Sequence, residues 1–160
     1  MMKIGVISDT HLKGANHILE KIVEKYFKDA DLILHAGDLT AMKVLDAFDG
    51  KEVIAVAGNS DTSDVKQRLP EREIITAGNF RIGLIHGWGL PMGLEKRVTF
   101  SFDRIHCLVF GHSHRAVNHR RNGIHYFNPG SFSGGIYSLW RRSIGLLTID
   151  RDIYGEIIRI

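Results

Sequence analysis

The chain has 160 residues, which is enough for one domain with a sizeable hydrophobic core. Its hydrophobic content of 44% and charged content of 24% are ordinary for a soluble globular protein. With 21 Lys and Arg against 18 Asp and Glu, the formal charge is only +3. This balance argues against a strongly basic nucleic-acid-binding module, so we expect nucleic acid at most as a substrate.

Cysteine usage and hydropathy narrow the class of protein further. Cys107 is the only cysteine, so the chain forms no intramolecular disulfide, and its apolar neighbours indicate a buried thiol. No apolar stretch approaches the ~20 residues of a membrane-spanning helix. The first residues form a strand pattern rather than a signal peptide. We therefore expect a cytoplasmic protein without a membrane partner.

In the first half of the chain, short apolar runs alternate with helical patterns. The apolar runs predict strands over residues 3–8, 32–36 and 52–57, and the periodicity of residues 15–27 and 41–48 predicts two helices. Strands and helices that alternate at this spacing predict a parallel α/β sheet.

Beyond residue 70 the pattern changes to hairpins. Gly78-Asn79 separates runs 72–77 and 80–86, and Asn122-Gly123 separates runs 116–121 and 124–127, as in two-residue β-turns. Short strands are predicted over residues 136–140, 143–150 and 153–160, with a helix near 94–100.

These elements predict a single domain over residues 1–160. Its fold class is α/β, with two packed mixed β-sheets (a β-sandwich) flanked by α-helices. Because the second half is rich in hairpins, its strands are expected to be antiparallel. We expect the last strand to lie in the core, with pairing between two chains in a homo-oligomer as the alternative.

Polar residues follow five of the predicted strands directly. They are Asp9 and His11 after the first, Asp38 after the second, Asn59 after the third and His86 at the end of the fifth. His112 and His114 follow the sixth, which is the apolar run 107–110. Open α/β sheets place ligand sites at these strand ends. A lone Asp in such a place is usually a cap or turn residue, and a lone His usually packs. The His-x-His pair, as part of a strand, would place both rings on one face.

Together, these seven residues predict a metal centre. Most of them are flanked by glycine, which permits positive φ and a close approach of the backbone in a crowded site. Seven donors exceed what one tetrahedral ion can use. Carboxylate, imidazole and amide donors without a thiolate suit two ions such as Mn²⁺, Fe²⁺ or Zn²⁺.

The same residues form five ordered motifs: Asp-x-His, Gly-Asp, Gly-Asn-x-Asp, His-Gly and Gly-His-x-His. This set resembles the calcineurin-like metallophosphoesterase superfamily. The short length and Asn128-Pro129-Gly130-Ser131 resemble its small YfcE-type phosphodiesterase branch. The resemblance runs from Ile4 to about Ser131. It implies a β-sandwich flanked by helices and hydrolysis of a phosphate ester, with a small phosphodiester as the expected substrate.

The resemblance also implies a role for each ligand. It gives Asp9, His11 and His114 to one ion, Asn59, His86 and His112 to the other, and Asp38 to both as a bridge. Asp38, Asn59 and His86 are the expected catalytic residues, and a hydroxide between the ions would attack phosphorus. We expect two Mn²⁺ ions, with Fe, Zn, Ni or Co as alternatives.

Further residues are expected to support the site or to contact substrate: Thr10, Asp61, Trp88, Asn128 and Ser131. Asp61 fits two roles, orienting a ligand imidazole or capping the helix that follows. Trp88 fits a substrate wall and equally an anchor for its loop. The turn at residues 128–131 fits a phosphate pocket and equally a simple turn. His35 is expected to pack or hydrogen-bond beneath the site.

Ser60 is a departure from the superfamily pattern. Many members have a histidine at this position that can protonate the leaving group, so no general acid is assigned here.

Two other functions remain as alternatives. A phosphomonoesterase or nucleotidase often balances the second negative charge of its substrate with Arg or Lys. No such residue lies in the five motifs, and Lys13 and Arg115 are the nearest. An interaction scaffold, like the retromer subunit that resembles these enzymes, could lose ligands without penalty. This chain has a competent residue at all seven positions.

Overall fold

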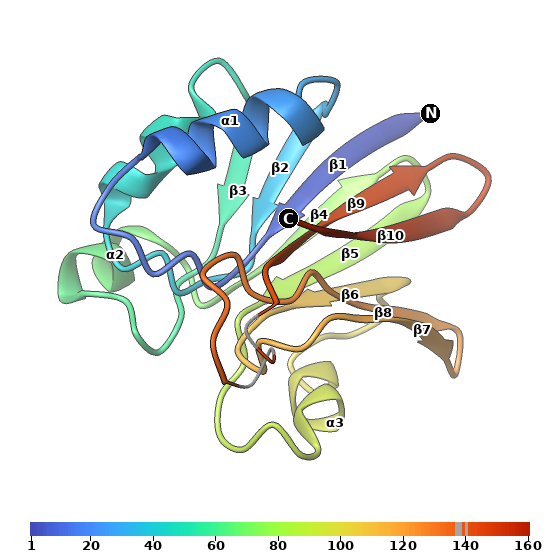
Figure 1. Ribbon diagram of the computed structural model, residues 1–160. Coiled ribbons are helices and arrows are strands. Elements are labelled where there is room, and N and C mark those ends of the chain that lie inside the picture. The colour runs from blue at the N-terminus through green and yellow to red at the C-terminus, as the bar shows by residue number, and fades with distance from the viewer. Residues whose placement is uncertain (137–138, 140) are drawn as a thin grey trace.

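Two five-stranded sheets face each other in this protein, with helices outside them (Figure 1). The computed structural model describes residues 1–136, 139 and 141–160. The strands are β1 Met2–Ile7, β2 Leu32–His35, β3 Val53–Ala55, β4 Arg72–Ala77, β5 Phe80–Ile85, β6 Cys107–Phe110, β7 Val117–Arg121, β8 Ile124–Asn128, β9 Ser143–Ile149 and β10 Ile153–Arg159. The helices are α1 His17–Tyr26, η1 Met42–Phe48, α2 Ser63–Arg68 and α3 Leu94–Thr99.

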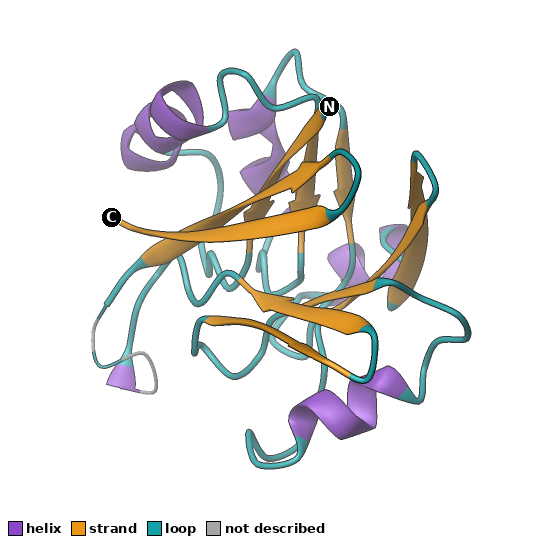
Figure 2. Cartoon of the chain, turned by 90° about the vertical axis from the view of Figure 1, so that its right-hand side faces the viewer, coloured by secondary structure: helices purple, strands orange, loops and turns teal. Residues whose placement is uncertain are grey.

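Both sheets are mixed, which confirms the predicted fold class. The first has the order β10-β9-β1-β2-β3, in which β1, β2 and β3 are parallel. The second has the order β4-β5-β6-β8-β7, in which β5, β6 and β8 are parallel. Figure 2 shows the two layers of strands from another side.

The prediction of an antiparallel second half holds for β9 and β10 but was wrong for the inner strands of the second sheet. Only the outer strands β4 and β7 are antiparallel to their neighbours in the second sheet, because crossovers connect β5, β6 and β8. The β9–β10 hairpin does not join that sheet. It returns to the first sheet, where β9 pairs with β1.

Alternation of side chains along the inner strands builds the core. In β1, Ile4 and Val6 lie between the two sheets, whereas Ile7 joins the cluster under α1 and η1. In β6, Val109 lies between the sheets and Leu108 packs beneath α3. The inner strands β1, β2 and β6 are therefore buried on both faces, as their apolar runs require.

The helices differ from their predictions in detail. Helix α1 is shorter than residues 15–27 and begins after Asn16, whose side chain accepts a hydrogen bond from the Leu19 N–H at 2.9 Å. Segment 42–48 is a 3₁₀ helix. The strand predicted at residues 136–140 falls mainly outside the described residues, and Ile136 and Leu139 are not in a strand.

Two other predictions concern Cys107 and the last strand. Cys107 is fully buried, and burial raises the pKa of its thiol to about 12. β10 is an edge strand, but Ile153 contributes to the core between the sheets. Asn118 and Arg120 of β7 donate side-chain hydrogen bonds to the carbonyls of Gly155 and Ile153. No helix of the described chain is long and apolar enough to cross a membrane.

The two sheets are in tight contact where Phe127 of β8 packs against glycines of β9 and β10. A Cβ on Gly145 would lie 2.5 Å from Phe127 Cζ, and one on Gly155 would lie 2.7 Å from Phe127 Cε2. Phe127 is fully buried in the core between the sheets, so its ring has little room to move. This contact sets the distance between the layers at that point.

We expect Gly145→Ala to destabilise the protein by ~1–3 kcal/mol, because the added methyl group overpacks the Phe127 ring. Urea unfolding should show a lower midpoint at an unchanged m-value. Gly14→Ala is the matched control, since its Cβ would meet nothing closer than Lys43 Cβ at 3.5 Å. Equal midpoints for the two variants would contradict the tight contact.

Candidate metal centre

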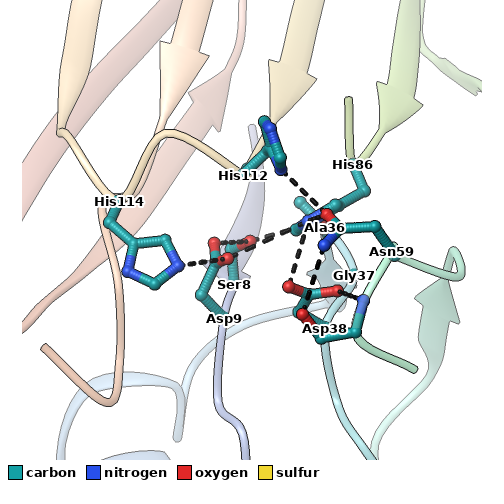
Figure 3. Close-up of polar contacts among 12 residues, drawn as sticks. Ser8, Asp9, Ala36, Gly37, Asp38, Asn59, His86, His112 and His114 are labelled. Carbon is teal, nitrogen blue, oxygen red and sulfur yellow. Dashed lines mark hydrogen bonds and ion pairs between the residues drawn. The ribbon is translucent and has the colours of Figure 1, made fainter. Parts of the chain in front are cut away.

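The predicted ligands meet where the carboxyl ends of the inner strands of both sheets adjoin. Parallel pairing of β1, β2 and β3 brings their ends to one edge, and parallel pairing of β5 and β6 does the same in the second sheet. The two edges are joined by His86, whose Nδ1 donates to the Ala36 carbonyl at 2.7 Å. Figure 3 shows the donor side chains pointing toward one another from these strand ends.

Two overlapping groups of side chains could each hold a cation. The first is Asp9, His11 and His114, and the second is Asp9, Asp38 and His86. Asp9 Oδ1 lies 3.0 Å from His114 Nε2 and 3.9 Å from His11 Nε2. Ligands bound to one ion at ~2.0–2.2 Å lie about 2.8–3.6 Å apart in octahedral or tetrahedral geometry. These donor atoms are thus close to the spacing of a shared ion.

Asp38 lies between ligands that the resemblance gives to different ions. Its Oδ2 is 3.7 Å from His11 Nε2 and 3.3 Å from His86 Nε2. Asn59 extends the cluster, because its Oδ1 lies 3.2 Å from His86 Nε2 and 2.9 Å from His112 Nδ1. The structure therefore brings all seven predicted ligands into one continuous cluster.

The protonation pattern of the histidines leaves lone pairs facing the cluster. His86 Nδ1 donates to a carbonyl, so in the neutral ring its Nε2 carries no hydrogen. His112 Nε2 donates to the Gly89 carbonyl at 2.7 Å, which leaves Nδ1 bare in the same way. Both bare nitrogens face oxygen atoms that are themselves acceptors. Backbone carbonyls that hold imidazoles in this way are typical of metal ligands.

Two buried ligand atoms of the cluster, Asp9 Oδ1 and His11 Nε2, lack a hydrogen bond within the described residues. His11 Nε2 is inaccessible to solvent and has no hydrogen-bond partner in the described part of the chain. A buried polar atom without a partner is unfavourable by about 1–3 kcal/mol. A cation would satisfy this atom together with the two carboxylates nearby, so the residues present fit a metal site.

The pKa values of the cluster show that it favours positive charge. Burial acts to lower the pKa of His86, but Asp38 and Asp9 outweigh it, so the pKa is raised. The carboxylate of Asp9 raises the pKa of His114 in the same way. For Asp38, burial acts to raise the pKa, yet His86 and the Ser60 N–H bring it well below its usual range.

Five of the seven ligands have a strained backbone: Asp9, His11, Asp38, His112 and His114 have φ between 48° and 66°. This left-handed conformation is unfavourable by roughly 1–2 kcal/mol for residues with a Cβ. The His112–His114 pair lies in a loop directly after β6, where the sequence placed it, and not within a strand. Strain of this kind concentrates at functional sites.

Comparison with known proteins identifies the family. A family model described as the calcineurin-like phosphoesterase superfamily domain matches residues 2–152. The chain belongs to this superfamily. A probable metallophosphoesterase of Methanocaldococcus jannaschii is 39% identical over 134 residues, 81% of this chain and 68% of the relative. The superfamily is metal-dependent. In this metallophosphoesterase, the side chains that could hold a metal belong to the five sequence motifs.

Two solved structures share the fold. An archaeal phosphodiesterase has a TM-score of 0.79 at 20% identity, over 99% of this chain and 100% of that chain. Wild-type Vps29 of Entamoeba histolytica, solved in complex with Zn²⁺, has a TM-score of 0.71 at 26% identity, over 99% of each chain.

Asp61 has a role that the sequence did not reveal. The buried carboxylate accepts hydrogen bonds from three backbone N–H groups, those of Asp38 at 3.1 Å, Thr40 at 2.6 Å and Gly58 at 2.7 Å. It contacts no ligand imidazole in the described chain, and Thr62 caps α2 instead. Asp61 thus ties together the two loops that carry Asp38 and Asn59 in this metallophosphoesterase.

Other buried groups hold the remaining loops. Ser8 Oγ donates to Asp9 Oδ2 at 2.6 Å, a contact that the sequence reasoning missed although the serine adjoins the first motif. Asn128 donates to the Gly111 carbonyl at 2.8 Å, and Ser131 to the Asp9 carbonyl at 3.3 Å. The turn at 128–131 therefore steadies two ligand loops.

His35 and Thr10 form a buried pair beneath the cluster, as predicted for His35. His35 Nδ1 accepts from the Gly37 N–H at 3.2 Å, and its Nε2 lies 3.1 Å from Thr10 Oγ1. Burial lowers the pKa of His35 to about 3, so its ring stays neutral and adds no charge under the carboxylates.

We expect Asp61→Ala to weaken metal affinity by roughly 10–100-fold, because the loop that holds Asp38 loses its anchor. Calorimetric titration with Mn²⁺ measures this affinity. Thr62→Ala is the matched control: it removes the α2 cap and lowers stability by ~1 kcal/mol without touching the Asp38 loop. Equal metal affinity in the two variants, with both folded by circular dichroism, would contradict the assigned role of Asp61.

Proposed function

We propose that this metallophosphoesterase is a phosphodiesterase that works with two divalent ions, Mn²⁺ in the first instance. The ligands are the seven residues of the cluster: Asp9, His11, Asp38, Asn59, His86, His112 and His114. The observation that carries the proposal is the convergence of these donor atoms with His11 Nε2 left unsatisfied. Two bound ions supply a water of lowered pKa and positive charge for the phosphate oxygens.

The residues of the chain prepare the site for an anionic substrate. Asp38 remains ionised at neutral pH, because its pKa is lowered, and holds the centre of the cluster. With two carboxylates and two divalent ions, the formal charge of the site is 4 − 2 = +2. Such a site attracts a phosphate ester and stabilises the charge that develops during its hydrolysis.

Asn59 and Ser60 are joined by a hydrogen bond beside the cluster. The Asn59 amide nitrogen donates to Ser60 Oγ at 3.2 Å, which orients the Asn59 oxygen toward His86 and His112. The Ser60 N–H donates to Asp38 Oδ1 at 2.8 Å. Ser60 therefore positions two ligands, and its hydroxyl is too weak an acid to protonate a leaving group efficiently at neutral pH.

The diester preference is supported by cavities at two ends of the cluster. One cavity of about 420 Å³ includes Asn59, His86 and Trp88 in its lining, and another of about 630 Å³ includes His114. In Figure 3, Asn59 and His114 lie on opposite sides of Asp9. A phosphodiester carries two substituents on phosphorus, and each cavity offers room for one. The archaeal phosphodiesterase with the same fold adds support by analogy.

The alternatives are a phosphomonoesterase or nucleotidase and an interaction scaffold. Arg115 lines the cavity at His114 and could balance the second negative charge of a phosphate monoester. This position supports phosphomonoesterase activity as an alternative. The fold shared with Vps29 supports the interaction scaffold as the other alternative. Hydrolysis of neither bis(p-nitrophenyl) phosphate nor p-nitrophenyl phosphate by metal-loaded protein would favour the scaffold.

Asp38→Ala tests the proposal directly. We expect loss of bis(p-nitrophenyl) phosphate hydrolysis by a factor of at least ~10³ and a reduced metal content, because the carboxylate between His11 and His86 is removed. Atomic emission measures the metal, and p-nitrophenyl phosphate serves as the monoester comparison. Asp46→Ala, at an exposed carboxylate in η1, is the control. Full activity of Asp38→Ala would overturn the assignment.

Trp88 is proposed as a wall of the substrate site. Its side chain is 48% exposed beside His86, and Arg97 anchors the loop by donating to the Trp88 carbonyl rather than through the ring. We expect Trp88→Ala to raise KM for aryl phosphodiesters by several-fold with a smaller change in kcat, since stacking on the indole is lost. Unchanged KM values across several phosphodiesters would show that the ring only fills the loop.

A further inference from the structure

The cavity beside His114 is lined by three arginines that the sequence does not place together. Arg115 follows His114 before β7, Arg141 precedes β9, and Arg159 is the last residue of β10. The three residues come from separate segments of the chain. Folding therefore gathers their charges at one end of the metal cluster, in a cavity of about 630 Å³.

These arginines have no partner within the described part of the chain. All three are exposed, their guanidinium groups make no hydrogen bond or ion pair there, and no Asp or Glu lines the cavity. Three arginines elsewhere do pair with carboxylates: Arg68 with Asp64, Arg120 with Asp152 and Arg121 with Glu95. Unpaired like charges around one cavity repel each other, and an anion removes that repulsion.

We propose that this cavity binds a second phosphate group of the substrate. This inference rests on the proposed function, since it places the scissile phosphate at the metal cluster. Guanidinium groups match phosphate in charge and in the planar geometry of two parallel hydrogen bonds. The substrate class is a phosphodiester in which one of the two substituents carries an additional dianionic phosphate.

The other cavity is less suited to that phosphate. Its lining contains one cation and one anion, Lys66 and Glu71, and the Lys66 ammonium already donates to the Asn59 carbonyl at 2.9 Å. Trp88 adds an aromatic surface on that side. The two ends of the site thus differ in charge, which orients an asymmetric diester with its phosphorylated substituent toward His114.

Calorimetric binding of two thymidine nucleotides to the Mn²⁺-loaded protein tests the proposal. Thymidine 5′-phosphate carries one phosphate, and thymidine 3′,5′-bisphosphate differs from it only by the second. We expect the bisphosphate to bind about tenfold more tightly, as charge-assisted hydrogen bonds to one phosphate provide. Equal affinity of the two nucleotides for the wild-type protein would overturn the proposal.

Variants of the arginines make the test specific. In Arg141→Gln, Arg159→Gln and the double variant, the ratio of the two dissociation constants should fall toward one. Arg151→Gln removes the same charge from an exposed position in the β9–β10 turn, at the other end of these strands, and should keep the wild-type ratio. A ratio that is unchanged in the double variant, or lowered equally in Arg151→Gln, would contradict the assigned cavity.

The proposed function is measured separately in the same preparations. Hydrolysis of bis(p-nitrophenyl) phosphate needs no second phosphate, so its absence from the wild type would contradict the phosphodiesterase. The ratio of nucleotide affinities reports on the arginine cavity alone. Failure of one proposal is therefore distinguishable from failure of the other.

Discussion

Asp9 and Asp38 place two carboxylates in the interior, where burial disfavours ionised groups. Each has one oxygen held by a conventional donor, Ser8 Oγ for Asp9 and the Ser60 N–H for Asp38. The other oxygen of each faces the imidazoles of the cluster. The two carboxylates also raise the pKa values of His86 and His114, so positive charge is favoured at this position. Bound metal cations would supply that positive charge, and much of the surrounding structure holds the carboxylates in place.

The backbone around the site is strained, and the strain is tied to the convergence of the ligands. Left-handed residues turn the chain sharply after a strand, so that a side chain points back over the strand end. Such turns persist only when their surroundings hold them. Asp61 does this for the Asp38 and Asn59 loops through three backbone N–H groups, and Asn128 and Ser131 do it for the loops of β6 and β1.

The charged residues around the site differ between its two ends. At one end, Lys66 and Glu71 accompany Trp88, and at the other, three arginines line a cavity that has no Asp or Glu among its described lining residues. A metal cluster alone attracts any phosphate ester. In the function proposed above, the difference in charge between its two ends selects among esters and orients them, because specificity is a difference between affinities.

The sequence by itself determined where most strands lie along the chain, which polar residue follows each of them and the family, because apolar runs and motif residues are local properties. It did not determine the parallel pairing of β5, β6 and β8, or the return of the β9–β10 hairpin to the first sheet. Those pairings depend on packing between distant segments. The same reason explains the support by Asp61, which contacts backbone 21 and 23 residues away, and the gathering of Arg115, Arg141 and Arg159. Only the tertiary structure decided these, since side chains far apart in sequence meet only when the two sheets pack together.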